Sequence, residues 1–273
     1  MTQPSSPATG KGSALITGAS SGIGAIYADR LAARGYDLIL VARNEERLHD
    51  VADRVQQAHG RKVTIVQADL GQRDDLARVE AILKTDPSIT LLVNNAGFGA
   101  VTPLLESSVD RMEQMIDINV TAPTRLTYAA APGFVTRGGG TIVNIASIVG
   151  VGVEIMNGVY GASKAFVLAL TQSLHHELAE KGVRVQAVLP GATATDFWDT
   201  AGLAHTSLPS GMVMRAEDMV DAALAGLDQG EVVTIPPLQD GNDWLEYEAM
   251  RRALSQRFAH ATPGARYLAK LAA

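Results

Sequence analysis

Hydrophobic and polar positions alternate between two patterns along this chain. From residue 13 onward, short runs of β-branched residues and leucine are followed by longer segments in which apolar side chains recur every three or four positions. Such alternation is typical of repeated strand–helix–strand units on a parallel sheet. Several runs are apolar at every position, as expected for strands that helices cover on both faces. We therefore predict the α/β class, with a doubly wound, seven-stranded parallel sheet.

The predicted elements follow one another without a linker, repeat or low-complexity tract after residue 12, so we predict a single domain over residues 12–273. The predicted strands are Ala14–Thr17, Leu38–Val41, Val63–Gln67, Leu91–Asn94, Thr141–Ile145, Val183–Val188 and Val232–Ile235. The predicted helices span residues 22–34, 45–59, 72–84, 108–131, 159–181 and 216–228.

Three segments lie outside this strand–helix alternation. Residues 1–11 are small, polar and proline-rich, and we expect a flexible leader there. Residues 196–215 form a long connection between a strand and a helix, which is typical of a lid. Residues 241–260 carry one apolar helical stripe, which we expect to pack against this domain or a neighbouring subunit; it consists of Trp244, Tyr247, Met250, Leu254 and Phe258.

Composition and charge exclude several classes of protein. The chain is 47% apolar and 19% charged, which is typical of a globular protein. Its 23 basic and 29 acidic residues leave a net charge of -6, so we expect no nucleic-acid partner. Without cysteine there is no disulfide or thiolate chemistry, and the six histidines show no metal-ligand spacing, so we expect no metal. No signal peptide or membrane-length apolar run is visible, and we expect a cytoplasmic protein without membrane contact.

The turn after the first predicted strand is rich in glycine. It reads Thr17-Gly18-Ala19-Ser20-Ser21-Gly22-Ile23-Gly24 and opens the first predicted helix. Free backbone N–H groups at such a helix start attract anions, and glycine lets a pyrophosphate approach the main chain closely. The alternative explanation of the glycines is tight packing of the helix on the strand.

The same residues satisfy a second motif of a different class. Gly18-Ala19-Ser20-Ser21-Gly22 matches the G-x-S-x-G turn of α/β hydrolases, in which Ser20 would be an acyl-transfer nucleophile. That turn normally follows an upstream oxyanion loop, whereas only a short polar segment precedes this one. We therefore keep the hydrolase as the minor alternative.

Three further motifs occur at the ends of later predicted strands. They are Asn94-Asn95-Ala96-Gly97, then Ser147, and then Tyr160-Gly161-Ala162-Ser163-Lys164. Together with the T-G-x-x-x-G-x-G turn, they resemble the short-chain dehydrogenase/reductase family in its single-domain branch, over roughly residues 12–236. The resemblance implies a Rossmann-like fold and an oxidoreductase that interconverts a carbonyl and a secondary alcohol with NAD(P). A dinucleotide-sensing protein without turnover is a third alternative.

The resemblance also implies a catalytic set, namely Asn119, Ser147, Tyr160 and Lys164. Tyr160 would protonate the carbonyl oxygen, Ser147 would donate a second hydrogen bond to it, and Asn119 would anchor a water that links Lys164 to solvent. Tyr160 and Lys164 are four positions apart, hence on one helical face. An ammonium about 5 Å from the phenol is expected to lower its pKa from about 10 by roughly two units.

A second set of residues is implied to bind the cofactor. The turn residues Gly18, Ser20, Ser21, Gly22, Ile23 and Gly24 would hold phosphate, with Tyr160 and Lys164 at the nicotinamide ribose. Asp69 and Leu70 would border the adenine, although Asp69 could instead be an ordinary helix cap. The adenosine ribose would be lined by Asn95, Ala96 and Gly97, and the nicotinamide and diphosphate by Pro190, Gly191, Thr193 and Thr195.

The end of the second predicted strand indicates which dinucleotide is used. NAD-selective sites usually place Asp or Glu there, whereas this strand ends Ala42-Arg43. A guanidinium suits the 2′-phosphate of NADP(H), so we predict NADP(H) over NAD(H). Arg43 could alternatively be a solvated loop residue.

The sequence indicates the substrate class less specifically than it indicates the cofactor. A largely apolar carbonyl or alcohol is favoured by the residues of the predicted lid and those near Ser147, unless these side chains only pack the lid on the body. They are Phe197, Trp198, Leu203, Met212, Met214, Phe98, Val149 and Val153. The resemblance further implies a homodimer or homotetramer formed through residues 108–131 and 159–181. The sequence does not identify the physiological substrate or the direction of the reaction.

Overall fold

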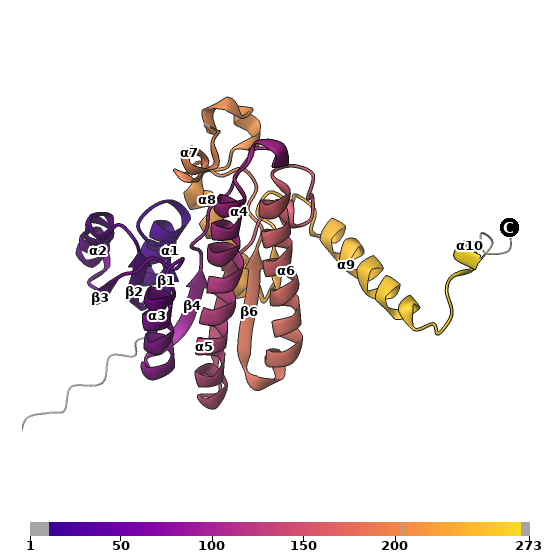
Figure 1. Cartoon of the computed structure of the whole chain (residues 1–273). Coiled ribbons are helices and arrows are strands. Elements are labelled where there is room, and N and C mark those ends of the chain that lie inside the picture. The colour runs from indigo at the N-terminus through magenta and orange to yellow at the C-terminus, as the bar shows by residue number, and fades with distance from the viewer. Residues whose placement is uncertain (1–10, 204, 269–273) are drawn as a thin grey trace, which may run out of the picture. The chain divides into compact units, whose positions relative to one another are not determined.

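The computed structural model describes residues 11–203 and 205–268 (Figure 1). The chain divides into two compact units with the boundary after Pro237. The expected leader over residues 1–11 lies outside the described residues except for Lys11. The single domain over residues 12–273 stays a prediction.

The first unit contains one parallel sheet of seven strands, in the order β3-β2-β1-β4-β5-β6-β7. The predicted doubly wound topology is confirmed, because the chain starts in the middle of the sheet and builds outward to both edges. The strands are β1 (Ser13–Thr17), β2 (Asp37–Ala42), β3 (Val63–Gln67), β4 (Ile89–Asn94), β5 (Gly140–Ile145), β6 (Val183–Val188) and β7 (Val233–Thr234).

Helices cover both faces of the sheet. The helices of the first unit are α1 (Gly22–Ala33), α2 (Glu45–His59), α3 (Arg73–Thr85), α4 (Val109–Ile116), α5 (Ala122–Thr136), α6 (Gly158–Leu178), α7 (Phe197–Ala201) and α8 (Ala216–Gln229). Alternate residues of β1 point to opposite faces: Ala14 and Ile16 pack with α1, α2 and α8, whereas Leu15 packs with α3, α5 and α6. Two apolar cores result, one on each side of the sheet.

The helix predicted over residues 108–131 differs from the observed one. It is divided into α4 and α5 by a π-helical turn at Asp117–Thr121, and α5 continues beyond Pro132 to Thr136. Proline removes one helical N–H, but the carbonyl left without that donor belongs to Tyr128, a residue that is 70% exposed and can be solvated. The spacing of apolar residues predicts neither the π-helical turn nor the continuation of the helix beyond Pro132.

A buried polar network joins the middle of the sheet to α6. The Asn94 side chain on β4 donates to Asn144 Oδ1 on β5 at 2.9 Å, and Asn144 Nδ2 donates to Thr171 Oγ1 on α6 at 2.9 Å. Because buried amides without partners are costly, this network favours one position of α6 along the sheet. The beginning of α6 is thereby fixed near the carboxyl ends of β4 and β5.

The second unit, described over residues 238–268, contains α9 (Gly241–Ser255), a 3-10 turn at Gln256–Phe258, and α10 (Ala265–Leu268). The helical segment predicted over residues 241–260 is therefore present in outline. Trp244 stacks on Tyr247 with ring centroids 5.1 Å apart, and Arg251 pairs with Glu248 at 2.9 Å. Across the described residues of both units, no helix has the length and apolar character needed to cross a membrane.

One buried hydroxyl in the first core yields a stability prediction. Tyr27 on α1 is completely buried, and its hydroxyl has no hydrogen-bond partner within residues 11–203 and 205–268. Removing an unsatisfied buried polar group relieves its desolvation penalty, so Tyr27→Phe should raise the free energy of unfolding by about 1 kcal/mol in urea denaturation. Tyr128→Phe, at an exposed position, serves as the control and should leave it unchanged. A loss of stability in Tyr27→Phe would contradict the prediction.

Candidate active site

The Gly-rich turn connects β1 to α1 at the carboxyl edge of the sheet. Gly18 and Gly22 have positive φ values of 65° and 51°, a region that favours glycine. A Cβ on Gly18 would lie 2.8 Å from Asn95 Nδ2, and one on Gly24 would collide with the Gly18 carbonyl. The tight packing of this turn therefore requires Gly18 and Gly24, which agrees with the alternative explanation that the glycines serve helix packing. Ser21 gives α1 no side-chain cap, which leaves the first-turn N–H groups available to an anion.

The start of the Asn94–Gly97 motif braces this turn. Thr17 Oγ1 accepts hydrogen bonds from the backbone N–H groups of Asn95 and Ala96, both at 3.0 Å. Asn95 Nδ2 donates to the carbonyls of Thr17 at 2.9 Å and of Gly18 at 3.1 Å. The side-chain amide of Asn95, which we expected at a ribose, thus stabilises the Gly-rich turn. A Cβ on Gly97 would lie 2.9 Å from Asn119 Oδ1 and 3.6 Å from Lys164 Nζ, so the close packing of these side chains requires glycine there.

Tyr160, Lys164 and Ser147 come together at the carboxyl end of β5. Tyr160 and Lys164 lie one turn apart near the start of α6, and the Lys164 Nζ is 5.8 Å from the centre of the Tyr160 ring. Lys164 Nζ donates to the Ile145 carbonyl at 2.9 Å, and Ser147 follows the same strand and shares a side-chain hydrogen bond with Tyr160. All three side chains are more than nine-tenths buried.

The electrostatic balance in this cluster differs from the sequence-based expectation. Burial raises the pKa of Tyr160 to about 12, and the hydrogen bond with Ser147 only partly offsets this. Burial also lowers the pKa of Lys164 to about 8. The expected lowering of the tyrosine pKa by the ammonium is therefore wrong for the protein alone, because burial disfavours the charged form of each group.

Asn119 reaches the same cluster from the π-helical turn. Its Oδ1 accepts from the Phe98 N–H at 3.1 Å, and its Nδ2 donates to the Phe98 carbonyl at 2.9 Å and to Ser163 Oγ at 3.1 Å. The side-chain amide is therefore engaged with protein atoms and ties the loop after β4 to α6. A water at this residue would have to use its backbone carbonyl rather than its amide.

The residues expected near the adenosine lie beyond the ends of β2 and β3. Arg43 is exposed and follows β2 directly, and its side chain has no ion pair among the described residues. Asp69 Oδ1 accepts from the Gly71 N–H at 3.0 Å, so this carboxylate supports the turn before α3. The N-cap of α3 is Gln72, so Asp69 is not the helix cap of the alternative explanation. The Leu70 side chain is buried in the core and leaves only its main chain for contact with a ligand.

The loop after β6 lies between Ser147 and the Gly-rich turn. The Pro190 carbonyl accepts from the Ile148 N–H at 3.0 Å and from Ser147 Oγ at 3.3 Å. Thr193 is buried, whereas a Cβ on Gly22 would lie 3.2 Å from Thr195 Cγ2. Gly191 packs toward Pro237 on the far side of this loop. The predicted set from residues 190–195 thus contacts both ends of the candidate site.

Apolar side chains gather beside Tyr160. A cluster of buried and partly buried residues joins Tyr160 to the loop after β4, to α4 and to the start of the predicted lid; it includes Phe98, Met112, Met115, Val149 and Phe197. Phe197 lies 5.7 Å from the Tyr160 ring, and Trp198 Nε1 donates to the Thr193 carbonyl at 2.8 Å. Among the other predicted lining residues, Met214 packs in the core on the opposite face, and Val153 and Met212 are exposed.

Sequence reasoning missed three side chains that shape this edge. Thr17 holds the Asn95–Ala96 backbone, Arg47 pairs with Asp196, and Asn157 caps α6 while donating to the Thr102 carbonyl at 2.6 Å. A usable signal existed for Asn157, because asparagine is a preferred N-cap and stands directly before the helix. Nothing in the local sequence indicates the long-range partners of Thr17 or Arg47.

The hydrolase alternative gains no support from the described residues. The Ser20 hydroxyl has no histidine or carboxylate hydrogen-bond partner in the described part of the chain, so the arrangement of an acyl-transfer nucleophile is missing there. Within residues 11–203 and 205–268, no three acidic or histidine side chains form a group that could hold a metal ion.

The comparison with known proteins agrees with this geometry. The family described as short chain dehydrogenase matches residues 13–204. An uncharacterised oxidoreductase of Staphylococcus saprophyticus is 35% identical over 223 residues, which cover 81% of this chain and 93% of the relative. A short-chain dehydrogenase of Sphingobium yanoikuyae, solved in complex with NADPH, is 47% identical, with 94% of this chain and 100% of that one covered and a TM-score of 0.91.

A third similar protein is the bulky-bulky ketone specific alcohol dehydrogenase of Comamonas testosteroni. It is 44% identical, with 94% of this chain and 98% of that one covered and a TM-score of 0.87. Matches of this extent cover the sheet, the Gly-rich turn and the Tyr160 cluster together. The chain therefore belongs to the short-chain dehydrogenase family.

Proposed function

We propose that this oxidoreductase interconverts a carbonyl and a secondary alcohol with NADP(H), and that Tyr160 is its acid and base. The observation that carries the proposal is the joint burial of Tyr160, Ser147 and Lys164 opposite the Gly-rich turn. A binding protein without turnover would not need a phenol, a hydroxyl and an ammonium desolvated at one place. The sensing alternative is therefore disfavoured.

The roles of the three side chains follow from their protonation and contacts. When bound, NADPH supplies the hydride that reduces the carbonyl carbon. With a pKa of about 12, Tyr160 is protonated at neutral pH and can donate its proton to the carbonyl oxygen. Ser147 can donate a second hydrogen bond to that oxygen, which fixes its position. Lys164, with a pKa of about 8, is charged at neutral pH and stands next to the phenol.

The residues present fit a dinucleotide phosphate. The positive φ values of Gly18 and Gly22 shape the Gly-rich turn, and the uncapped first turn of α1 offers N–H donors to a phosphate. Arg43, which has no ion pair within the part of the chain that the structure describes, presents its guanidinium at the end of β2, where a carboxylate would select NAD(H). The NADPH complex of the Sphingobium protein supports the same choice.

The apolar cluster beside Tyr160 indicates the substrate class. Phe98, Val149 and Phe197 surround the phenol, so the substrate should be a ketone with apolar substituents, or the matching alcohol. The ketone specificity in the name of the Comamonas protein supports a bulky substrate. The cytoplasmic location and the homodimer or homotetramer stay predictions.

Substitution of the proposed acid tests the reaction. Tyr160→Phe should lower kcat for ketone reduction by a factor of about 10² to 10⁴, because it removes the proton donor, while NADPH still binds. Cofactor absorbance reports the turnover, and calorimetric titration reports the binding. Tyr128→Phe, far from the site and exposed, should keep full activity. Undiminished turnover in Tyr160→Phe would refute the assignment.

The substrate class has its own test. With NADPH as cofactor, kcat/KM should be at least about tenfold higher for ketones with two large apolar substituents than for small charged keto acids, since each buried methylene contributes about 0.8 kcal/mol. A panel of carbonyl compounds followed by cofactor absorbance measures this ratio. Preference for the keto acids would contradict the apolar site.

Burial of Lys164 yields a prediction with a defined pH window. The folded-state pKa is about 8 and the unfolded value is 10.5, so the unfolded chain binds more protons between these values and stability rises with pH there. At pH 7 the buried charge is destabilising. Lys164→Met should therefore raise the unfolding free energy at pH 7 by about 2 kcal/mol and abolish turnover.

The increase in unfolding free energy that Lys164→Met brings should be smaller at pH 9.5 than at pH 7. A pH of 9.5 is still below the range where Tyr160 ionises. Urea denaturation of both proteins at pH 7 and pH 9.5 measures the difference. Lys62→Met, at an exposed site on the opposite end of the sheet, should show no such change with pH. A gain that is the same at both pH values would contradict the role of the buried charge.

A further inference from the structure

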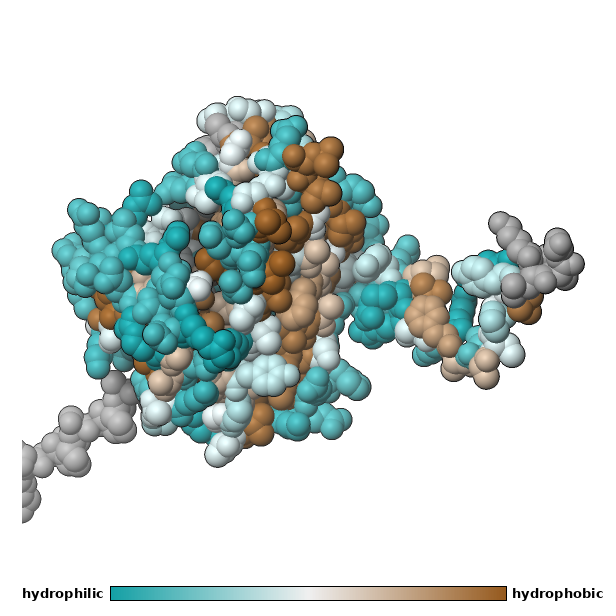
Figure 2. All heavy atoms as spheres, in the orientation of Figure 1, coloured by the Kyte–Doolittle hydropathy of each residue, from teal (hydrophilic) through white to brown (hydrophobic). Residues whose placement is uncertain are grey.

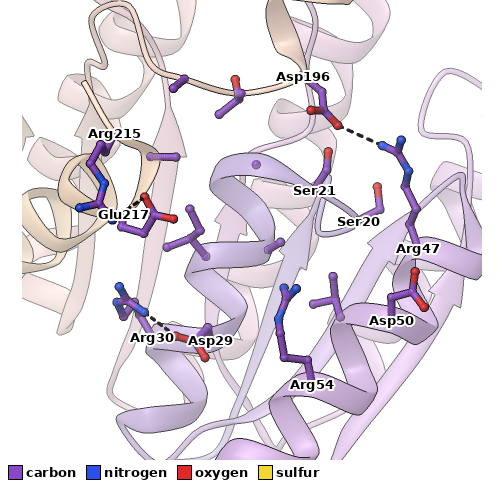
Figure 3. Close-up of a pocket in the computed structure, with 17 residues that line it drawn as sticks. Ser20, Ser21, Asp29, Arg30, Arg47, Asp50, Arg54, Asp196, Arg215 and Glu217 are labelled. Atoms are coloured by element: carbon purple, nitrogen blue, oxygen red, sulfur yellow. Dashed lines mark hydrogen bonds and ion pairs between the residues drawn. The ribbon is translucent and has the colours of Figure 1, made fainter. Parts of the chain in front are cut away.

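The predicted lid, residues 196–215, is fixed to the body at both ends. Near its start the Ala194 N–H donates to the carbonyl of Met214, close to its end, at 2.9 Å. Both ends border a cavity of about 730 Å³ beside the Gly-rich turn (Figure 3), across which Asp196 pairs with Arg47 of α2 at 3.1 Å. The middle of the lid, which includes α7, has to be held by other contacts.

The short helix α7 is held at its carboxyl end by donors from outside the lid. It has five residues and ends at Gly202, whose φ of 89° lies in the left-handed region. The last carbonyls of a helix lack donors within the helix. That of Ala201 accepts from the Val101 N–H at 3.1 Å, and that of Thr200 accepts from Arg111 Nη2 at 2.6 Å. Because so short a helix is not stable by itself, these two hydrogen bonds contribute to its position.

Arg111 lies on a well-packed part of α4. Its neighbour Met112 is buried in the apolar cluster beside Tyr160, and the guanidinium carbon of Arg111 lies 5.8 Å from the centre of the Phe98 ring. The Asn119 amide holds the Phe98 backbone at both its N–H and its carbonyl. A guanidinium at the carboxyl end of a helix also interacts favourably with the helix dipole. Arg111 therefore connects α7 to the elements that surround the reactive cluster.

The first residue of α7, Phe197, lies against the reactive phenol. Its ring centre is 5.7 Å from that of Tyr160. A Cβ on Gly99 would collide with Phe197 Cζ and would lie 3.3 Å from Tyr160 Cε2, so the missing side chain lets the Phe197 ring approach the backbone there. With α7 in this position Tyr160 is only 5% exposed. The helix α7 thus helps to close the site over the phenol.

Apolar surface borders the closed site. Figure 2 shows it over α4 and the turn before it, where Leu104, Leu105 and Val109 are exposed. The exposed carboxylates of Glu106 and Asp110 lie in the same stretch and disfavour an anionic keto acid. This side of the site therefore suits the apolar ketone that α7 would cover.

We propose that Arg111 is a positioning residue, which holds α7 through the Thr200 carbonyl so that Phe197 packs against a ketone bound beside Tyr160. The inference rests on the proposed ketone reduction and adds to it a residue outside both the reactive cluster and the cofactor site. Because Arg111 acts through the position of α7, its hydrogen bond contributes to binding of the ketone rather than to transfer of hydride or proton. Its loss should therefore raise KM and leave kcat nearly unchanged.

Steady-state kinetics of the full chain, with saturating NADPH and a ketone that has two large apolar substituents, test this. Arg111→Gln should raise KM for the ketone about fivefold, in the range for loss of one hydrogen bond to a charged group, and keep kcat within about twofold. Arg111→Lys keeps a charged donor and should raise KM less. The dissociation constant of NADPH should stay within about twofold in both variants, because the cofactor site lacks this residue.

Arg137 provides a matched control. Its Nη2 donates to the Ile89 carbonyl at 2.8 Å, and its guanidinium carbon lies 5.5 Å from the centre of the Phe134 ring, so its contacts resemble those of Arg111. Ile89 begins β4 and thus lies at the opposite edge of the sheet from the site. Arg137→Gln removes comparable contacts without affecting α7, and it should leave KM and kcat unchanged.

The fluorescence of Trp198 reports on α7 without turnover. Trp198 is buried, and its Nε1 donates to the Thr193 carbonyl at 2.8 Å. The chain has two tryptophans, so Trp244→Phe leaves Trp198 as the sole tryptophan emitter. In this background Arg111→Gln should increase the quenching of Trp198 by acrylamide about twofold, because α7 opens more often, whereas Arg137→Gln should not.

Three results would overturn the proposal. An unchanged or lower KM in Arg111→Gln would mean that α7 does not hold the ketone. A fall in kcat at constant KM would assign Arg111 to the chemical step, and an equal rise of KM in Arg137→Gln would reduce the effect to one of general stability. All three leave the proposed function intact. Absence of ketone reduction by the unaltered protein would refute the proposed function, and the quenching of Trp198 would still decide whether Arg111 holds α7.

Discussion

The ammonium group of Lys164 is buried at the carboxyl end of β5, where it donates to the Ile145 carbonyl a hydrogen bond that it would otherwise donate to water. Such burial is unfavourable unless the surrounding structure holds the group in place. The Asn94–Asn144–Thr171 network does so, because it fixes α6 against the two central strands. The position of Tyr160, one turn from Lys164 on the same helix, follows from this docking. The chemistry of the site therefore depends on a polar network deep in the fold.

The same desolvation sets the protonation states on which catalysis would rely. A phenol whose pKa is raised to about 12 remains an acid at neutral pH, whereas an ammonium whose pKa is lowered to about 8 stays charged but close to releasing its proton. Burial thus moves the two pKa values apart, from 10.0 and 10.5 to about 12 and about 8. The phenol therefore keeps its proton in the protein alone, because its pKa lies above that of the neighbouring ammonium.

The loop after β6 joins the two halves of the site. Pro190 contacts the Ser147 segment, Thr195 packs on Gly22 of the phosphate turn, and Phe197 contacts Tyr160. Residues 190–197 thus connect the place where phosphate would bind to the place where a carbonyl would react. A change at one end of this loop is transmitted through contiguous packing rather than through distant elements.

The local sequence was sufficient for the elements, and the family resemblance of its motifs named the residues that meet in the Tyr160 cluster. Apolar runs predicted each strand, including β7 at the edge with two residues too many, and the spacing of Tyr160 and Lys164 predicted their shared helical face. Strand ends of a parallel sheet meet at one edge, so the motifs could be expected to converge there. These features depend on short-range periodicity, which a sequence displays directly.

Only the tertiary structure decided which partners the polar side chains take. It assigned the amide of Asn95 to the turn, that of Asn119 to Phe98 and Ser163, and the guanidinium of Arg47 to Asp196. It also reversed the expected direction of the Tyr160 pKa shift, since the degree of burial is not visible in spacing. Hydrogen-bond partners and desolvation arise from residues far apart in the chain, and for that reason they exist only once the chain has folded.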